Sequence, residues 1–187
     1  MRFILIILLL FPFHSQAAFL LKYGLNYSSE NDASDVDEYE KSRTFHKAYL
    51  GASVNSKKTL YFGWNVNSWN SEISKGSSPE NSYSILEMGP RLVWFTNENH
   101  NLYFTAEWNP YARGDREKEN VSREVQGSSM ALGMGYRFRL SRLIGLGASI
   151  HYHSLSLNEE KIGSTENNIS DSITHFMPML EISILTR

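Results

Sequence analysis

The sequence predicts an all-β protein: an eight-stranded antiparallel up-and-down transmembrane β-barrel, preceded by a cleavable signal peptide. Three observations lead to this prediction. The chain starts with a short apolar run behind a basic residue, it continues with eight segments in which apolar and polar residues alternate, and the connections between these segments are alternately long and short. A length of 187 residues suits a single domain.

The N-terminal segment has the pattern of a secretory signal peptide. Arg2 precedes an apolar run from Phe3 to Phe13, and Ser15 and Ala17 are the small residues of a small-x-small cleavage site. The run is about half as long as the ~20 apolar residues that a transmembrane helix needs. We therefore expect a signal peptide at 1–17, a barrel at 18–187, and export through the periplasm.

The first four alternating segments lie roughly at 19–28, 45–55, 59–69 and 83–95. A period of two is the period of a strand and does not fit a helix. Each segment is long enough to cross a bilayer at a tilt. Their apolar faces carry, in chain order, Leu21, Tyr23 and Leu25; Ala48, Leu50 and Ala52; Leu60, Phe62 and Trp64; and Leu86, Met88 and Leu92.

The last four segments lie roughly at 102–111, 125–140, 143–157 and 173–187 and alternate in the same way. Eight such segments in series are a much stronger indication of a barrel than any one of them. Their apolar faces carry Phe104, Ala106 and Trp108; Met130, Leu132 and Met134; Ile144, Leu146 and Ile150; and Phe176, Leu180 and Ile182.

The connections support the same topology. The long ones lie near 29–44, 70–82, 112–124 and 158–172, and they are rich in Asp, Glu, Asn, Ser, Lys and Gly. The short ones lie near 56–58, 96–101 and 141–142. This alternation is typical of barrels with short periplasmic turns and longer outside loops.

The two faces of the segments indicate which side meets lipid. Eight strands enclose only enough space for side chains to fill, so a face that carries Trp64, Trp94 and Trp108 is expected outside. The other face is charged or rich in glycine, and a charge near the bilayer midplane costs ~2–4 kcal/mol. We therefore expect bulky apolar residues outside and small or charged residues in the lumen.

The inward charges are expected to form a structural polar network, because an unpaired charge in a narrow lumen is costly. If the short connections close symmetrically, Arg91 lies opposite Glu107, while Arg137 and Arg139 lie opposite glycines, which leave room for the guanidinium groups. The predicted members are Glu87, Arg91, Glu107, Arg137, Arg139 and Glu181.

A second cluster consists of histidines. His151, His153 and His175 fall on inward positions of neighbouring strands, and His46 is a further candidate. Imidazoles at this spacing can bind a metal or act as a general base. The alternative is polar filling of the lumen, since no carboxylate is clearly placed to orient a ring. We expect no catalytic residue, no metal and no cofactor.

Architecture gives the chain a resemblance to a known class. With its signal peptide, eight alternating strands, four long outside loops and charged lumen, it resembles the eight-stranded outer-membrane barrels of the OmpA transmembrane-domain and OmpX type. Such barrels commonly end with an aromatic residue, whereas this chain ends with Thr186 and Arg187. The resemblance implies the outer membrane of a Gram-negative bacterium.

The expected function is a structural or adhesion-type role through the four long loops, with a closed polar lumen. One alternative is a lipid A-modifying enzyme, because Ser154 and Ser156 lie near His153 and Ser156 is expected on the inward face with it. Another is a narrow pore or a carrier of small apolar ligands. The expected partners are outer-membrane lipid or lipopolysaccharide and the outer-membrane assembly machinery. We expect a monomer, and no nucleic acid, because the net charge is only −2.

Overall fold

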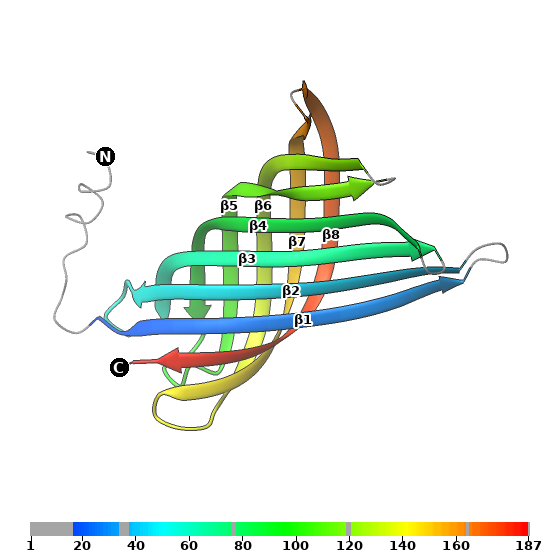
Figure 1. Cartoon of the computed structure of the whole chain (residues 1–187). Coiled ribbons are helices and arrows are strands. Elements are labelled where there is room, and N and C mark those ends of the chain that lie inside the picture. The colour runs from blue at the N-terminus through cyan, green and yellow to red at the C-terminus, as the bar shows by residue number, and fades with distance from the viewer. Residues whose placement is uncertain (1–16, 34–37, 76–77, 119–120, 164, 187) are drawn as a thin grey trace, which may run out of the picture.

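A computed structural model describes residues 17–33, 38–75, 78–118, 121–163 and 165–186. The described residues form eight antiparallel strands in one closed barrel (Figure 1). Nearly all of the predicted signal peptide, residues 1–16, lies outside the described residues. The strands are β1 (Phe19–Ala33), β2 (Glu38–Ser53), β3 (Leu60–Lys75), β4 (Ser78–Phe95), β5 (Leu102–Lys118), β6 (Val121–Arg139), β7 (Ile144–Ile162) and β8 (Thr165–Leu185).

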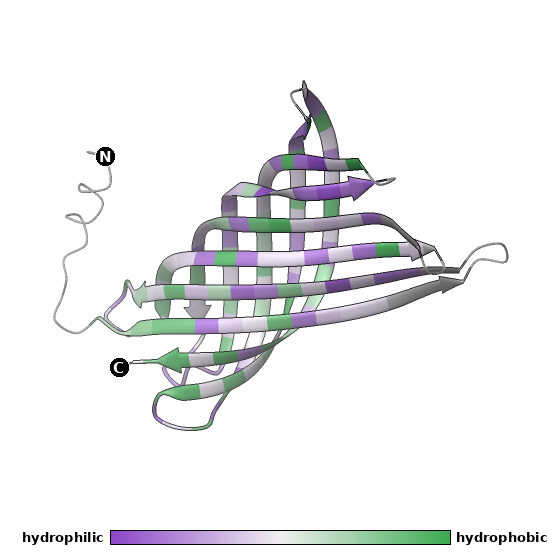
Figure 2. Cartoon of the chain, in the orientation of Figure 1, coloured by the Kyte–Doolittle hydropathy of each residue, from purple (hydrophilic) through white to green (hydrophobic). Residues whose placement is uncertain are grey.

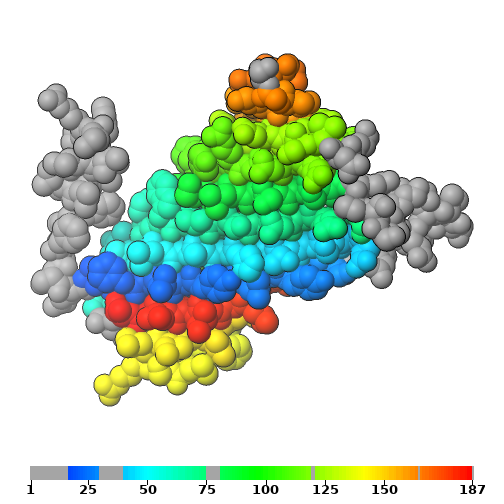
Figure 3. Space-filling view, in the orientation of Figure 1, coloured from blue at the N-terminus to red at the C-terminus, as the bar shows by residue number. Residues whose placement is uncertain are grey.

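Each strand pairs with the next one along the chain, and β1 pairs with β8 to close the ring. Figure 3 shows β1 (blue) and the C-terminal part of β8 (red) side by side. The predicted fold class, an up-and-down eight-stranded antiparallel barrel, is confirmed. Within the described part of the chain, no helix is long and apolar enough to cross a membrane.

The strands are longer than the sequence predicted at the end of the barrel where the long connections lie. Most of the residues expected in long loops are strand, and the segments between strands at this end are 34–37, 76–77, 119–120 and 163–164. Register pairs such as Arg113↔Gln126 continue far into the polar segments. The polar composition was therefore a wrong indication of loop, because antiparallel pairing satisfies the backbone of a hairpin whether or not its side chains are apolar.

The register of the strands shifts by a fixed number of residues on one circuit of the barrel. Register partners followed round the sheet from Leu20 on β1 lead to His175 on β8, whereas Leu20 itself pairs with Leu185. The two β8 positions are ten residues apart, which sets the strand tilt. An eight-stranded barrel has an interior just wide enough for side chains to fill it.

The outer face of the barrel is apolar over the half that ends in the short turns. Trp64, Trp94 and Trp108 all point outward, as predicted. In Figure 2, hydrophilic and apolar residues alternate along the strands. The expectation that large residues avoid the lumen is wrong, since several bulky side chains are fully buried inside: Tyr49, Tyr61, Phe95, Tyr103, Phe45 and Trp69.

Prolines mark the irregular places in the sheet. Pro79, Pro90 and Pro110 lie at or beside shifts of register, and Pro178 lies just beyond the end of the β1–β8 ladder. Proline has no N–H to give to a ladder, so it is confined to edges and bulges. The bulge at Pro110 also reverses which residues of β5 point inward, so that Ala112 is buried.

Candidate functional site: the layered lumen

The lumen is filled by three layers of side chains, stacked along the barrel axis. An apolar layer lies near the short turns, a charged and hydrogen-bonded layer lies in the middle, and a second apolar layer lies toward the tall hairpins. The lower layer is made of Ala18, Leu20, Tyr49, Tyr61, Val93, Phe95, Tyr103 and Leu185. The upper layer is made of Phe45, Trp69, Ile85, Ala112, Val125, Leu155, Leu157, Met177 and Met179.

The middle layer contains buried ion pairs, of which Lys47–Glu107 runs across the lumen. Lys22 lies 2.9 Å from Glu181, and Lys47 lies 2.8 Å from Glu107. Arg91 lies 3.3 Å from Glu107, its register partner on the neighbouring strand. All five side chains are buried, so each charge depends on its partner rather than on water. The predicted pairing of Arg91 with Glu107 is what the structure has.

Glu87 is the second centre of the middle layer. Its carboxylate accepts hydrogen bonds from the Trp69 indole at 3.0 Å, the Ser129 hydroxyl at 2.8 Å and the Asn67 amide at 3.2 Å. The Nε2 atom of His153 lies 3.0 Å from both carboxylate oxygens. A buried carboxylate needs several donors of this kind, so Glu87 joins four strands in one hydrogen-bonded cluster.

The two remaining predicted arginines lie apart from these pairs. Arg137 is buried near the short turns, where Nε donates to Ser183 at 2.7 Å and Nη2 to the Leu143 carbonyl at 3.3 Å. Arg139 is exposed and donates to the carbonyl of Ser141 at 3.0 Å. The prediction that Arg139 belongs to the lumen network is wrong, because β6 ends at this residue and its side chain lies on the rim.

The predicted histidine cluster is brought together only in part. His153 and His175 are register partners, and their rings stack with centroids 6.3 Å apart. His151 lies lower in the lumen, 3.9 Å from Glu107 and 3.8 Å from Glu181. His46 is not a member: it lies on the outer face, 2.7 Å from the Tyr23 hydroxyl, because the odd-numbered residues of β2 point inward.

Contacts with Glu87, Glu107 and Glu181 thus give His151 and His153 carboxylate neighbours that the sequence did not reveal.

The serines considered for catalysis are elsewhere. Leu155 and Leu157 fill the inward positions of β7 next to His153, so Ser154 and Ser156 point outward. The expectation that Ser156 shares a face with His153 is wrong, and the structure does not assemble a serine with this histidine.

Glycines make room for the large inward groups, as predicted for the arginines. A Cβ atom at Gly145 would meet the Arg137 guanidinium, and one at Gly133 would meet the His151 ring. At Gly135 it would meet the Tyr103 hydroxyl, which hydrogen-bonds to Glu181. Small residues on β6 and β7 therefore determine where the bulky polar side chains can lie.

Lys22 and Lys47 are the members of the charged layer that the predicted network omitted. Both alternate with outward apolar residues, Lys22 with Leu21 and Tyr23, and Lys47 with Ala48. Strict alternation along β1 and β2 would have placed both in the lumen. Within the apolar upper layer, Ala112 was harder to find, because it follows the bulge at Pro110 that shifts the alternation of β5.

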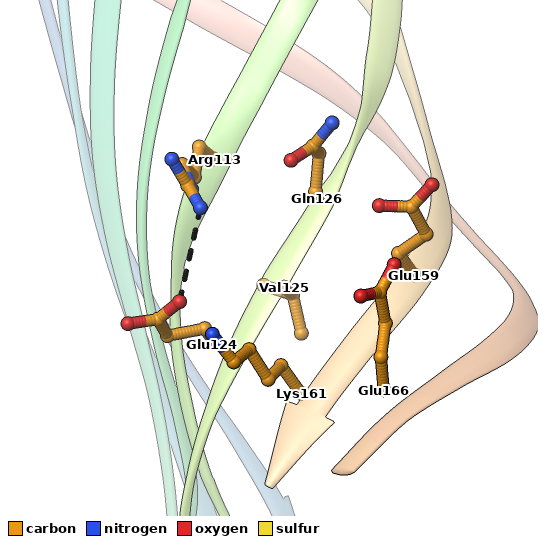
Figure 4. A pocket seen from close by; sticks show the side chains of 7 residues that line it. All are labelled: Arg113, Glu124, Val125, Gln126, Glu159, Lys161 and Glu166. Carbon is orange, nitrogen blue, oxygen red and sulfur yellow. Dashed lines mark ion pairs between the residues drawn. The ribbon is translucent and has the colours of Figure 1, made fainter. Parts of the chain in front are cut away.

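The hairpins above the upper layer carry a different polar surface. Toward the inside, Arg116 pairs with Asp171 at 3.5 Å and Arg123 with Glu160 at 3.2 Å. On the outside, β5 to β8 form a pocket of about 140 Å³ (Figure 4). Its lining residues are Arg113, Glu124, Val125, Gln126, Glu159, Lys161 and Glu166.

Comparison with known proteins identifies the fold but not a close relative. No protein-family model matches the sequence, and no curated protein sequence is significantly similar to it. The structure is similar to the crystal structure of Neisserial surface protein A (NspA), with a TM-score of 0.57 and 10% identity, covering 90% of this chain and 98% of that chain.

Two autotransporter domains are similar to a smaller extent. The translocator domain of NalP from Neisseria meningitidis gives a TM-score of 0.45 at 10% identity, covering 98% of this chain and 67% of that chain. The β domain of the Bordetella autotransporter BrkA gives 0.46 at 12% identity, covering 89% and 68%. Both scores are below 0.5, so neither establishes a common fold by itself. The likeness to NspA shows that this chain has the fold of an outer-membrane β-barrel, in agreement with the location predicted from the sequence.

Proposed function

We propose that this protein is an outer-membrane barrel that acts at the cell surface through its tall hairpins, in a structural or adhesion-type role, and not by conduction through its lumen. The observation that carries the proposal is the layered lumen. Two apolar layers of fully buried side chains enclose the charged layer. These layers carry few polar groups that could replace the hydration shell of an ion, so the outer wall and not the interior is available for interaction.

The height of the hairpins supports the same role. The 21 residues of β8, at ~3.3 Å each and a tilt of about 40°, rise roughly 50 Å, whereas the apolar band of such a barrel is only ~25 Å tall. About half of β8 therefore stands above the lipid, and a smaller share of the 15 residues of β1 does. Paired strands hold this surface in a fixed shape, which favours recognition.

The outer faces of the hairpins carry an excess of acidic residues. Among the described residues, the outward acidic side chains are Glu40, Glu72, Asp115, Glu117, Glu124, Glu159 and Glu166, and the outward basic ones above the apolar belt are Arg113 and Lys161. A second pocket, of about 430 Å³, lies on the outer side of β2 to β6 and is lined mainly by Ser, Thr, Asn, Asp and Glu. This charge favours a partner with a basic surface.

The partners that we propose follow from this placement. The apolar belt contacts outer-membrane lipid. The polar outer surface of the hairpins just above it lies at the level of the lipopolysaccharide head groups. The ring is closed by β1 and β8 of the same chain, so no second copy is needed to complete the barrel. We propose a monomer that the outer-membrane assembly machinery inserts.

Shortening one hairpin tests the surface role. Ala112 and Gly127 are register partners, so residues 113–126 can be replaced by an Asn-Gly turn, which suits a two-residue hairpin. We expect the shortened barrel to keep its heat-modifiable gel migration, while bacteria that display it adhere less to epithelial monolayers and to one another. Equal adhesion of both strains would contradict the proposal.

Two further measurements on the unaltered protein separate the alternatives. We expect no steady current in planar bilayers, and unchanged lipid A by mass spectrometry in cells that express the protein. A stable current would favour a pore, and altered acylation would favour an enzyme.

A further inference from the structure

The ladder between β1 and β8 is much shorter than the other ladders of the barrel. It runs from Leu20↔Leu185 to Leu25↔Leu180 and then stops, although β1 continues to Ala33. The ladder between β1 and β2, in contrast, runs along the whole of β1. Figure 1 shows the C-terminal end of β8 beside the start of β1 and the rest of β8 running in a different direction.

Pro178 explains why the ladder stops there. Its carbonyl accepts a hydrogen bond from the Asn26 side-chain amide at 2.6 Å, so this carbonyl points toward β1. The N–H and C=O of a strand residue point to the same neighbour, and proline has no N–H. Continued pairing would place Tyr27 opposite Pro178 and would need the missing donor. The Asn26 amide supplies one hydrogen bond where a backbone pair would form two.

The outer wall is least covered beside this break. The three most exposed large apolar side chains of the described barrel are Leu180 at 75%, Phe176 at 70% and Tyr27 at 67%, and all three belong to β1 or β8. Tyr27 and Phe176 lack the neighbour that a continuous ladder would bring against them, and Leu180 belongs to the last pair before the break. They are also part of the apolar belt, at its end toward the hairpins, which corresponds to the outer leaflet.

The inner side chains of β8 show the same loss of cover. His153 and Leu155 on β7 are fully buried, whereas their register partners His175 and Ile173 on β8 are only half-buried, although all four point inward. The exposed sides of His175 and Ile173 face the gap between β8 and β1, because the β7 side of β8 is paired. Of the inner groups on this side, His175 is half-buried, whereas Met177 is fully buried. The indole of Trp69 lies 5.9 Å from the His175 ring.

We propose that the seam between β1 and β8 is a lateral opening, through which an acyl chain of an outer-leaflet lipid enters the upper apolar layer. At this seam, no hydrogen-bonded ladder between described residues separates the apolar belt outside from the apolar layer inside. Met177 and Met179 line its inner side, and flexible methionines adapt their packing to a guest chain. This role depends on the membrane location and is independent of adhesion by the hairpins.

Tryptophan quenching can test the opening, because the chain has four tryptophans and no cysteine. Trp69 is buried inside, and the other three point outward. The variant Trp64→Phe/Trp94→Phe/Trp108→Phe therefore reports on the upper layer alone. In vesicles of phosphatidylcholine with brominated acyl chains, we expect Trp69 to lose emission relative to unbrominated vesicles.

A disulfide across the seam provides the matched control. In the same background, Ser29→Cys/Phe176→Cys joins two positions that a continued ladder would bring together, and it leaves Pro178 in place. We expect the oxidised protein to lose the bromine quenching of Trp69 and the reduced protein to regain it. A protein that retains both Trp69 and Trp108 should keep the quenching of its outward tryptophan in either state.

A single substitution gives an independent test that needs no disulfide. Pro178→Val restores the missing N–H, so the ladder can extend and the quenching of Trp69 should fall. Absence of quenching in the open protein would overturn the proposal. Equal quenching in the open, oxidised and Pro178→Val proteins would also overturn it, because the brominated acyl chains would then quench Trp69 without passing through the seam.

Discussion

Lys47 on β2 and Glu107 on β5 meet in the middle of the barrel, with Nζ 2.8 Å from Oε1. These strands are not neighbours in the ring, so the pair connects opposite parts of the wall. Arg91 and His151 approach the same carboxylate. The charged layer is therefore a set of cross-braces as well as a way to neutralise buried charge.

Removal of one partner from this pair should be costly. We expect Lys47→Met to lower the free energy of unfolding by about 3 kcal/mol, because it leaves Glu107 buried with fewer positive partners. Equilibrium urea unfolding in lipid vesicles measures the change. The matched control is Arg113→Met in the hairpin pair with Glu124, where both side chains are more than half exposed and the loss should stay below about 1 kcal/mol. Similar losses for both variants would contradict a bracing role.

Substitution of Glu87 tests the hydrogen-bonded cluster. The groups around its carboxylate include the Trp69 indole, the Asn67 amide and the Ser129 hydroxyl, all of which donate to it. Glu87→Gln places an amide N–H₂ among these donors, so we expect a loss of about 1–3 kcal/mol. The emission of Trp69 in the variant without the other tryptophans should change as its acceptor is lost. Unchanged stability and emission would show that the cluster does not depend on the carboxylate.

Two glycines of the wall should respond differently to the same change. A Cβ at Gly63 would meet backbone atoms of Leu50 and Gly51 on the neighbouring strand, which cannot move aside. At Gly24 it would meet the flexible end of Met179, 3.0 Å away. We expect Gly63→Ala to abolish the heat-modifiable folded band and Gly24→Ala to retain it. Equal folding yields would mean that the β2–β3 contact is looser than the structure has it.

The assignment of the outer face predicts a large effect of charge in the belt. Leu132 is 62% exposed in the isolated chain, but in the membrane it faces lipid. We expect Leu132→Arg to cost ~2–4 kcal/mol in vesicles. Ser84→Arg, on the outer face of a hairpin above the belt, should cost far less. Vesicle unfolding experiments compare the two, and a small cost at Leu132 would place this residue outside the hydrocarbon.

Alternation of residue types was sufficient to predict the strand order, the outward tryptophans and the register of Arg91 with Glu107. The wrong faces assigned to His46 and Ser156 have another cause. The alternation is unbroken at both places, and counting from the inward Lys47 and His153 puts both side chains outward. Each assignment follows from a single parity choice, and a slip of one residue exchanges the two faces of a strand.

The upper half of the barrel was harder to predict for a different reason. Outside the apolar belt, the outward residues are polar, so contrast between the two faces is weak there. The bulges near Pro110 and Asn158 then reverse the alternation. Two contacts join strands that are far apart in the ring: Trp69 with His175, and Lys47 with Glu107. Such contacts depend on how the barrel closes, and the residue pattern of a single strand cannot predict them.

The order of the three layers has a consequence for the cell that makes this protein. A solute moving along the barrel axis would have to give up its hydration at the lower apolar layer, even if the upper layer admits a lipid tail from the side. With the closed lumen that we propose, we expect many copies to accumulate without making the envelope permeable to hydrated nutrients, toxins or antibiotics.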